Sequence, residues 1–231
     1  MKTKEGLWKL SPSGLYGFDD CKACFWLEQH HGKGPGLPWL LNSAMDSILK
    51  ARYDEYRTKD KMPPEVKKLE DEGISLFKDT EALNKWRGST KELKIVNEKV
   101  GFEMGGKIDD LLIEPDGKFI PMDFKSSGYA PKDDKQKYYV SQLNAYALMF
   151  REHGHEPSDR AYLLHYFVKD TKDPSLSVEF TSHIDLVKLD LMVFENKLAD
   201  IVDFLNKSYP GDDLECEYCS YYTGLQKAKK K

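Results

Sequence analysis

The sequence lacks the features that mark membrane and secreted proteins. None of its apolar runs approaches the ~20 residues that a membrane-spanning helix needs, and residues 1–6 do not contain the apolar segment of a signal peptide. We also find no internal repeat and no sign of a second domain. The expectation is therefore a cytoplasmic protein without a membrane partner, in which residues 1–231 form a single domain.

The chain also lacks an excess of positive charge. Its 35 Lys and Arg residues against 39 Asp and Glu residues give a net charge of -4, which argues against a protein that binds nucleic acid over its whole surface. A local basic patch is compatible with this total, because the acidic residues of an active site contribute to it. With 40% hydrophobic and 32% charged residues, the chain can bury one sizeable core.

Two β-rich apolar runs flank a turn signal in the middle of the chain. Residues 105–113 and 119–125 are separated by a short segment that contains Asp116-Gly117, a dipeptide typical of tight hairpin turns. The sequence therefore predicts two antiparallel strands at this point.

Three polar residues border the core of this hairpin. Asp123 and Lys125 are two positions apart, so both project from one face of the second strand while Phe124 points to the other face. Asp109 borders the first apolar run. A buried lysine beside carboxylates needs compensation by a metal ion or an anionic substrate, and two such carboxylates can hold a hard divalent cation and orient a water molecule against a phosphate. An exposed ion pair on a surface hairpin is the alternative.

Three ordered motifs resemble those of RecB-type nucleases in the PD-(D/E)xK superfamily. They are Gly-Lys-Ile-Asp at residues 106–109, Met-Asp-Phe-Lys-Ser-Ser at 122–127 and Gln-Leu-Asn-Ala-Tyr at 142–146. The group includes helicase-linked nuclease domains such as RecB and AddB and the exonucleases associated with CRISPR adaptation. The resemblance extends from about residue 10 to about residue 222, and it implies an α/β fold with a restriction-endonuclease-like core, a mixed central sheet flanked by helices.

The resemblance also implies an activity. It predicts an Mg²⁺- or Mn²⁺-dependent deoxyribonuclease, an exonuclease on single-stranded DNA or DNA ends, that serves DNA repair, recombination or CRISPR adaptation, with a helicase or CRISPR-adaptation proteins as partners. In this interpretation Asp109 and Asp123 bind the metal ion, Lys125 activates water, and Gln142 and Tyr146 lie beside the active site. One alternative is a non-catalytic DNA-binding or assembly subunit that retains the fold. Another is a stand-alone repair or phage-type exonuclease.

A further metal ligand is expected on a helix that begins near residue 41. Relatives carry a histidine of the metal site on the matching helix, and Asp46 stands at that place here. A carboxylate can replace an imidazole at a hard-metal site. An alignment shifted by one turn would instead make Asp46 a surface residue.

The cysteines form two C-x2-C pairs at opposite ends of the chain. In an intracellular protein, this arrangement predicts a four-thiolate metal site rather than disulfides, which would join residues 1–45 to residues 205–225. RecB-type relatives often hold an iron–sulfur cluster with one amino-terminal and three carboxy-terminal cysteines, so the two-plus-two arrangement here departs from the family. Spacing alone suits a [4Fe–4S] cluster or zinc equally, and the resemblance favours the cluster. The four candidates are Cys21, Cys24, Cys216 and Cys219.

Basic residues beside aromatic residues are candidate DNA contacts. Basic side chains that flank a tryptophan can neutralise single-stranded DNA and stack on it, although a tryptophan that anchors a helix to the core is the alternative. The basic segment 226–231 is expected to be a flexible tail and a further DNA contact. The candidates are Lys85, Trp86, Arg87, Lys132, Lys135 and Lys137.

The remaining patterns predict the elements around the hairpin. Helices are expected over residues 10–27, from residue 41, over much of 50–90 with a break at 62–64, over 136–151 and over 185–206. Strands are expected over 91–104, 161–168 and 175–184, and a Gly/Pro-rich loop over 29–41. The inward-facing residues of the first strand are expected to be Leu93, Ile95, Val96, Val100 and Phe102.

Overall fold

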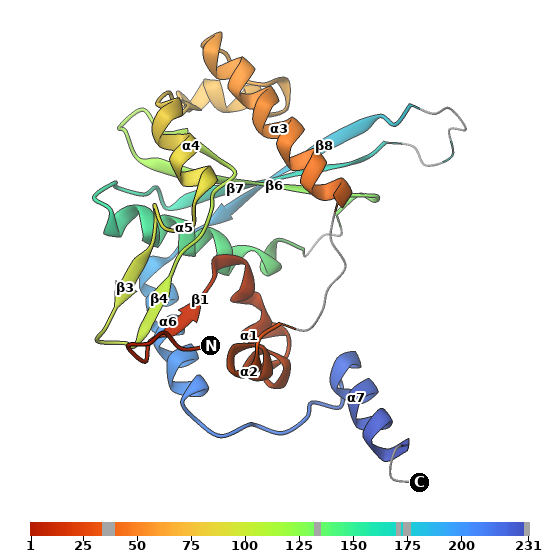
Figure 1. The fold of residues 1–231 in the computed structure, drawn as a ribbon. Helices are drawn as coiled ribbons and strands as arrows, with labels where there is room; N and C mark the ends of the chain where they lie inside the picture. Colours follow the sequence, from red (N-terminus) through yellow and green to blue (C-terminus); the bar gives the residue numbers. More distant parts are fainter. Residues whose placement is uncertain (34–39, 132–134, 170–171, 173–176, 229–231) are drawn as a thin grey trace.

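The structure is a computed structural model that describes residues 1–33, 40–131, 135–169, 172 and 177–228 (Figure 1). It has an α/β architecture with one sheet of five strands and one of three, flanked by helices. Within the described ranges, no helix combines the length and the apolar character that crossing a membrane requires. The predicted α/β fold is confirmed.

The five-stranded sheet contains the predicted hairpin. Its order is β2-β5-β6-β7-β8, where β6 and β7 are parallel and the other neighbours are antiparallel, so the sheet is mixed as predicted. Gly117 in the β5–β6 turn has φ of 90°, a left-handed conformation that glycine adopts without a steric penalty. The strands are β2 Ser75–Leu76, β5 Asp110–Ile113, β6 Phe119–Ser127, β7 Arg160–Val168 and β8 Phe180–Lys188.

The side chains of β6 alternate between the two faces of this sheet. Phe124 packs on Tyr53 of α3 (Leu40–Thr58), with ring centroids 4.8 Å apart. Asp123 instead bonds to Gln142 of α5 (Val140–Glu152). The predicted separation of Asp123 from Phe124 is thus confirmed. Figure 1 shows α3 and α5 on opposite sides of the sheet, so β6 runs between two helices.

A small sheet replaces the single strand predicted over residues 91–104. It contains β1 (Trp8–Leu10), β4 (Phe102–Met104) and β3 (Ile95–Asn97) in that order. The prediction of one strand was wrong because the chain reverses at Gly101, whose φ is 102° and whose N–H group donates to the carbonyl oxygen of Asn97 at 2.8 Å. Val96 is 52% exposed and does not face inward.

Helix boundaries also differ from those predicted. The helix expected over residues 10–27 is divided into η1 (Pro12–Gly14), α1 (Tyr16–Asp20) and α2 (Lys22–His31), because Cys21 has extended backbone angles. The helix expected from residue 185 is α6 (Leu191–Leu205). Asp190 caps its first turn, because the Asp190 side chain accepts a hydrogen bond from the Val193 N–H group at 2.9 Å.

The other predicted segments are shorter or shifted, and the region 50–90, predicted to be helical apart from a break at 62–64, also contains a strand. The region 50–90 contains the end of α3, η2 (Pro64–Glu72), β2 and α4 (Thr80–Gly88). The helix expected over 136–151 is α5, preceded by η3 (Lys135–Tyr138), and the strand expected over 175–184 is β8, which begins at Phe180. Part of the loop expected over 29–41, and residues 173–176, lie outside the described residues.

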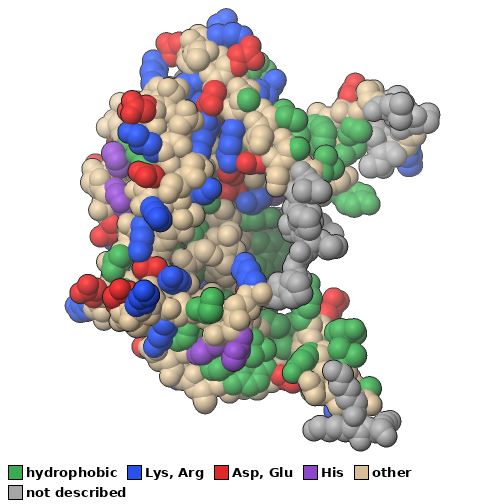
Figure 2. Space-filling view, viewed as in Figure 1, with side chains coloured by type: hydrophobic (Ala, Val, Ile, Leu, Met, Phe, Trp, Pro, Cys, Tyr) green, Lys and Arg blue, Asp and Glu red, His purple; other side chains and the backbone are tan. Residues whose placement is uncertain are grey.

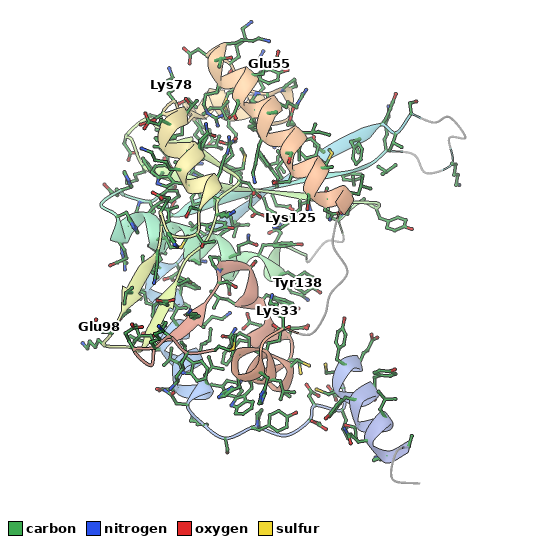
Figure 3. The ribbon with its side chains drawn as sticks, viewed as in Figure 1. Lys33, Glu55, Lys78, Glu98, Lys125 and Tyr138 are labelled. Atoms are coloured by element: carbon green, nitrogen blue, oxygen red, sulfur yellow. The ribbon has the colours of Figure 1, made fainter. Side chains whose placement is uncertain are left out.

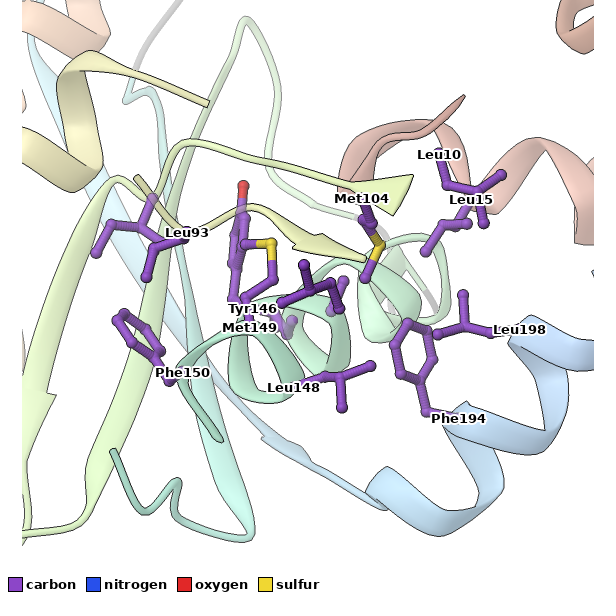
Figure 4. Close-up of a cluster of buried hydrophobic side chains, with 14 of the residues drawn as sticks. Leu10, Leu15, Leu93, Met104, Tyr146, Leu148, Met149, Phe150, Phe194 and Leu198 are labelled. Carbon is purple, nitrogen blue, oxygen red and sulfur yellow. The ribbon is translucent and has the colours of Figure 1, made fainter. Parts of the chain in front are cut away.

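The larger core lies on the α5 side of the five-stranded sheet. Figure 4 shows α5 contributing Tyr146, Leu148, Met149 and Phe150 to this core. The small sheet covers one side of these residues and α6 another. The helix that supplies Gln142 and Tyr146 is therefore fixed on several sides, and all its residues from 141 to 150 are buried.

Candidate active site

Two carboxylates meet at the β5–β6 hairpin. Asp109 immediately precedes β5, and its Oδ2 accepts a hydrogen bond from the Phe124 N–H group at 2.9 Å. Asp123 on β6 is only 1% exposed. Its Oδ1 accepts a hydrogen bond from Gln142 Nε2 at 2.8 Å, and its Oδ2 lies 2.5 Å from Lys125 Nζ. The hairpin therefore brings Asp109, Asp123 and Lys125 together, as the sequence predicts.

Lys125 contacts Gln142 of α5 and Tyr139, the residue that precedes α5. Its Nζ lies 3.4 Å from Gln142 Oε1 and 4.7 Å from the centre of the Tyr139 ring, where a cation is attracted by the aromatic face. Burial favours the neutral amine, but the Asp123 carboxylate outweighs it, so the pKa of Lys125 lies above its ordinary value. Lys125 is therefore a positively charged group at the edge of the site (Figure 3).

Gln142 and Tyr146 lie one turn apart on α5. Gln142 Nε2 donates to the Tyr146 hydroxyl at 2.7 Å, so the two predicted residues belong to one buried chain of hydrogen bonds that ends on Asp123. Tyr138, four residues before Gln142, belongs to η3 and packs edge-on against Tyr16. Tyr139, which sequence reasoning missed, faces Lys125 because the change from η3 to α5 shifts the helical phase.

Burial changes the proton affinity of Asp123. Burial raises its pKa, the Lys125 ammonium lowers it, and the Asp109 carboxylate raises it again, so that the pKa of Asp123 is about 7. Near neutral pH, this carboxyl group is therefore divided between its neutral and charged forms. A bound cation would favour the charged form.

Asp46 is linked to Asp109 through a lysine between them. Its Oδ2 lies 2.8 Å from Lys50 Nζ, which in turn lies 2.9 Å from Asp109 Oδ1. Among the described residues, Asp46, Asp109 and Asp123 do not form a compact group of metal-ligating atoms. Sequence reasoning missed Lys50, although its position four residues after Asp46 on one helix was a usable signal.

A pocket of about 520 Å³ opens onto this site. One wall comes from the start of α3 and the other from the end of β6 and its neighbour β7. The wall is rich in small polar side chains, which suit a phosphate-bearing ligand. Lining residues besides Asp46, Lys125 and Tyr139 include Asn42, Ser43, Ser47, Ser126, Ser127 and His165.

A family model described as the PD-(D/E)XK nuclease superfamily matches residues 9–223. The chain belongs to this superfamily. Asp123, Phe124 and Lys125 fit the (D/E)XK part of its name. No curated protein matches the chain.

Two solved structures are distantly similar to this superfamily member. The crystal structure of SSO0001 has 14% sequence identity and a TM-score of 0.42, covering 96% of this chain and 87% of that one. An alkaline exonuclease from Laribacter hongkongensis has 12% sequence identity and a TM-score of 0.44, and the match covers 98% of this chain and 96% of that one. These likenesses are too distant to carry an argument about function.

In this superfamily member, two of the candidate DNA-binding residues make contacts within the fold. Trp86 packs against aromatic rings of the core, including Phe150 at 5.2 Å. Arg87 is 8% exposed and pairs with Asp54 and Asp110. These contacts account for Trp86 and Arg87 without nucleic acid, so we leave both out of the proposed DNA surface.

The other basic candidates are less constrained. Lys85 is exposed and lies 2.8 Å from Glu81, and Lys137 lies over the Tyr138 ring. Lys132 and the Lys135 side chain are outside the described residues, as are residues 229–231 of the basic segment, whereas its residues 226–228 belong to α7 (Glu217–Ala228). On the visible face, basic and acidic side chains are interspersed (Figure 2).

The four cysteines cluster where α2 meets α7. All four Sγ atoms lie within 4.8 Å of one another, including the pairs Cys21–Cys219 and Cys24–Cys216 at 3.7 Å and Cys24–Cys219 at 3.6 Å. Burial raises the pKa of the Cys24 and Cys219 thiols, whereas a backbone N–H group lowers the pKa of Cys216. The predicted junction of the two terminal segments at a four-cysteine site is confirmed.

Proposed function

We propose that this protein is a metal-dependent deoxyribonuclease that hydrolyses phosphodiester bonds. The observation that carries the proposal is the convergence of Asp109, Asp123 and Lys125 at the β5–β6 hairpin, where Asp123 is buried and bonded to Gln142 and Lys125 lines the adjoining pocket. Membership of the superfamily supports the same activity.

The carboxylate oxygens fit a hard divalent cation. Mg²⁺ and Mn²⁺ prefer such oxygen ligands, and the burial that raises the pKa of Asp123 is a cost that a nearby cation would offset. Asp109 and Asp123 would hold the ion. When bound, the ion supplies Lewis-acid chemistry that generates hydroxide from water and polarises the phosphate.

The residues of the chain then have distinct tasks. Lys125 places a positive charge beside Asp123, where it can stabilise the charge that develops on the phosphate. The Phe124 N–H group fixes the Asp109 carboxylate. Gln142 positions both Asp123 and Lys125, and Tyr146 holds the Gln142 amide group. Gln142 and Tyr146 are therefore positioning residues.

The proposed substrate is single-stranded DNA or a DNA end. Asp123 is almost fully buried and is paired with Lys125, which lines the pocket, so the pocket is the proposed route of the scissile phosphate. A flexible strand or strand end can enter such a pocket more easily than the middle of an intact duplex. The three motifs that resemble RecB-type, AddB-type and CRISPR-associated nucleases support an exonuclease in repair, recombination or CRISPR adaptation. They also support a helicase or CRISPR-adaptation protein as partner.

Cleavage of end-labelled DNA tests this proposal. Single- and double-stranded substrates are incubated with Mg²⁺, Mn²⁺ or EDTA and either wild type, Asp123→Ala or Lys125→Ala. We expect cleavage that requires the metal ion and is lost in both variants, while Lys118→Ala at the far end of the hairpin, paired with exposed Asp116, stays active. Activity retained in both site variants would overturn the assignment.

The alternative is a DNA-binding or assembly subunit without turnover. Its supporting observation is Asp46, which stands where relatives carry a histidine and is paired with Lys50. Metal-independent DNA binding without cleavage, by folded wild type with a filled cysteine site, would favour it.

For the cysteine site, we propose a single zinc ion, the alternative to the iron–sulfur cluster that the resemblance favours. Four sulfur atoms about 2.3 Å from one tetrahedral zinc ion lie about 3.8 Å from one another, close to the 3.6–3.7 Å pairs of this site. A [4Fe–4S] cluster has four irons and four sulfides between its thiolates, which requires a wider spacing. Cys21 accepts a hydrogen bond from the Cys24 N–H group at 3.5 Å, a contact that stabilises a thiolate ligand of zinc or of a cluster alike.

Metal analysis of anaerobically purified protein tests this assignment. We expect the wild-type protein to contain one zinc ion per chain and no acid-labile sulfide, and to have no brown colour. The double variant Cys24→Ser, Cys219→Ser is expected to lose the zinc ion. Stoichiometric iron and sulfide would establish the cluster instead. This measurement does not depend on nuclease activity.

A further inference from the structure

A lysine that the proposed mechanism does not use bridges two carboxylates of the site. Lys50 Nζ lies 2.8 Å from Asp46 Oδ2 and 2.9 Å from Asp109 Oδ1. The Lys50 side chain is 22% exposed, compared with 56% for Lys59, which forms an ordinary pair with Glu55 further along α3. Unlike that surface pair, Lys50 therefore reaches from its helix into the carboxylate site.

The ammonium group occupies the space between Asp46 and Asp109. A second cation shared by these two carboxylates would have to displace it, because both contacts are at direct ion-pair distance. Asp109 Oδ2 is already bonded to the Phe124 N–H group at 2.9 Å. Each carboxylate oxygen accepts about two hydrogen bonds or ligand contacts, so Asp109 retains capacity for an ion on the side of Asp123.

Formal charges favour one divalent ion. Asp46, Asp109 and Asp123 contribute three negative charges when ionised, and Lys50 and Lys125 contribute two positive charges, which leaves one negative charge. One divalent ion changes this to one positive charge, which a phosphodiester group balances. A second divalent ion would leave two positive charges uncompensated in the complex with DNA.

We propose that Lys50 is a built-in cation that takes the place of a second divalent metal ion in this active site. The site then holds a single Mg²⁺ or Mn²⁺ ion on Asp109 and Asp123. Asp46 positions Lys50 and is not a metal ligand, in contrast to the expectation from the sequence. The inference rests on the proposed function for the identity of the site.

Manganese titration tests the inference without measuring activity. Protein with a filled cysteine site is titrated with Mn²⁺ by calorimetry and by electron paramagnetic resonance, because two ions held about 3.5–4 Å apart show magnetic coupling. We expect wild type, Lys50→Arg and the control Lys59→Met to bind one uncoupled ion per chain. Lys50→Met keeps the apolar part of the side chain without its charge, and we expect it to bind two coupled ions.

The wild-type titration alone can overturn the inference, even where Lys50→Met does not fold. A coupled pair in wild type would do so, as would a folded Lys50→Met that still binds one ion. The double variant Asp46→Asn, Lys50→Met keeps the net charge of the site, and we expect it to bind one Mn²⁺ within about threefold of the wild-type affinity. A much weaker affinity would make Asp46 a metal ligand and refute its positioning role.

DNA cleavage separates this inference from the function on which it rests. Wild type that binds one ion but does not cleave DNA would refute the nuclease proposal and leave the role of Lys50 standing. Wild type that cleaves DNA with a coupled pair of ions would refute the role of Lys50 alone.

Discussion

Asp110→Asn is expected to destabilise the fold strongly, because Asp110 is the central carboxylate of a buried ion network. Its side chain is 0% exposed and pairs with Arg57 and Arg87, which are 2% and 8% exposed. Asp54, at 35% exposed, is the other carboxylate that pairs with both arginines. The substitution keeps the shape of the side chain and removes its charge, so two buried guanidinium groups lose their most buried partner.

Breaking a buried ion pair by removing one partner costs about 3–5 kcal/mol. Small domains have only about 5–15 kcal/mol in total, so this change removes about a fifth or more of the stability. The assay is urea unfolding followed by circular dichroism, where an unchanged slope shows that the midpoint reports stability. Glu55→Gln makes the same carboxylate-to-amide change in an exposed pair on α3 and is expected to have little effect.

A loss below about 1 kcal/mol in Asp110→Asn would refute this reasoning, because that is the range of exposed pairs. If replacing Arg57, Arg87 and Asp110 together by apolar residues left the stability unchanged, the reasoning would still hold. Removing a whole buried network is often tolerated. The comparison separates the cost of an unpaired buried charge from the net stabilisation that the network supplies.

Three further predictions concern the active site. In Gly106→Ala, the added Cβ would lie 2.7 Å from Pro12 Cγ. We therefore expect urea unfolding to show a loss of about 1–3 kcal/mol in the free energy of unfolding. Gly88 has open space around it, so Gly88→Ala should leave the free energy of unfolding unchanged or raise it. In Gln142→Leu, loss of the 2.8 Å bond to Asp123 should reduce kcat about 10- to 100-fold in single-turnover cleavage. In metal-free protein, the folded-state pKa of Asp123, about 7, exceeds the unfolded value of about 3.9. The folded state therefore binds more protons between pH 4 and 7, and the free energy of unfolding should fall as pH rises through this window and then level off; Asp123→Asn should remove this dependence.

Local patterns predicted the hairpin and its acidic residues because their causes are local. The turn at Gly117 and the alternation around Phe124 depend only on neighbouring residues. The cysteine junction was also predictable, because two C-x2-C pairs in one chain are a common pattern of metal sites. The expectation of a mixed central sheet flanked by helices came from the resemblance to a known fold.

The errors came from contacts between distant parts of the chain. Asp185 looked like the start of a helix, but it lies in β8 and accepts a hydrogen bond from Gln136 at 2.7 Å. The sequence also did not show that Arg87, a candidate DNA contact, pairs with Asp110 inside the fold. Lys50 has the spacing of an ordinary surface pair with Asp46, and only the position of Asp109, 59 positions further along the chain, gives it a further partner.

The adjacent acids Asp109 and Asp110 show how one strand can both fix and expose a functional group. Neighbouring residues at the start of β5 point to different sides, so Asp110 is fully buried with two arginines while Asp109 is 17% exposed beside Lys50. Arg87 links the two positions, because it pairs with the Asp110 carboxylate and donates to the Asp109 carbonyl oxygen at 2.7 Å. The buried ion network around Asp110 therefore fixes the backbone from which the Asp109 carboxylate projects. For this reason, loss of Asp110 should reduce DNA cleavage as well as stability, in molecules that remain folded.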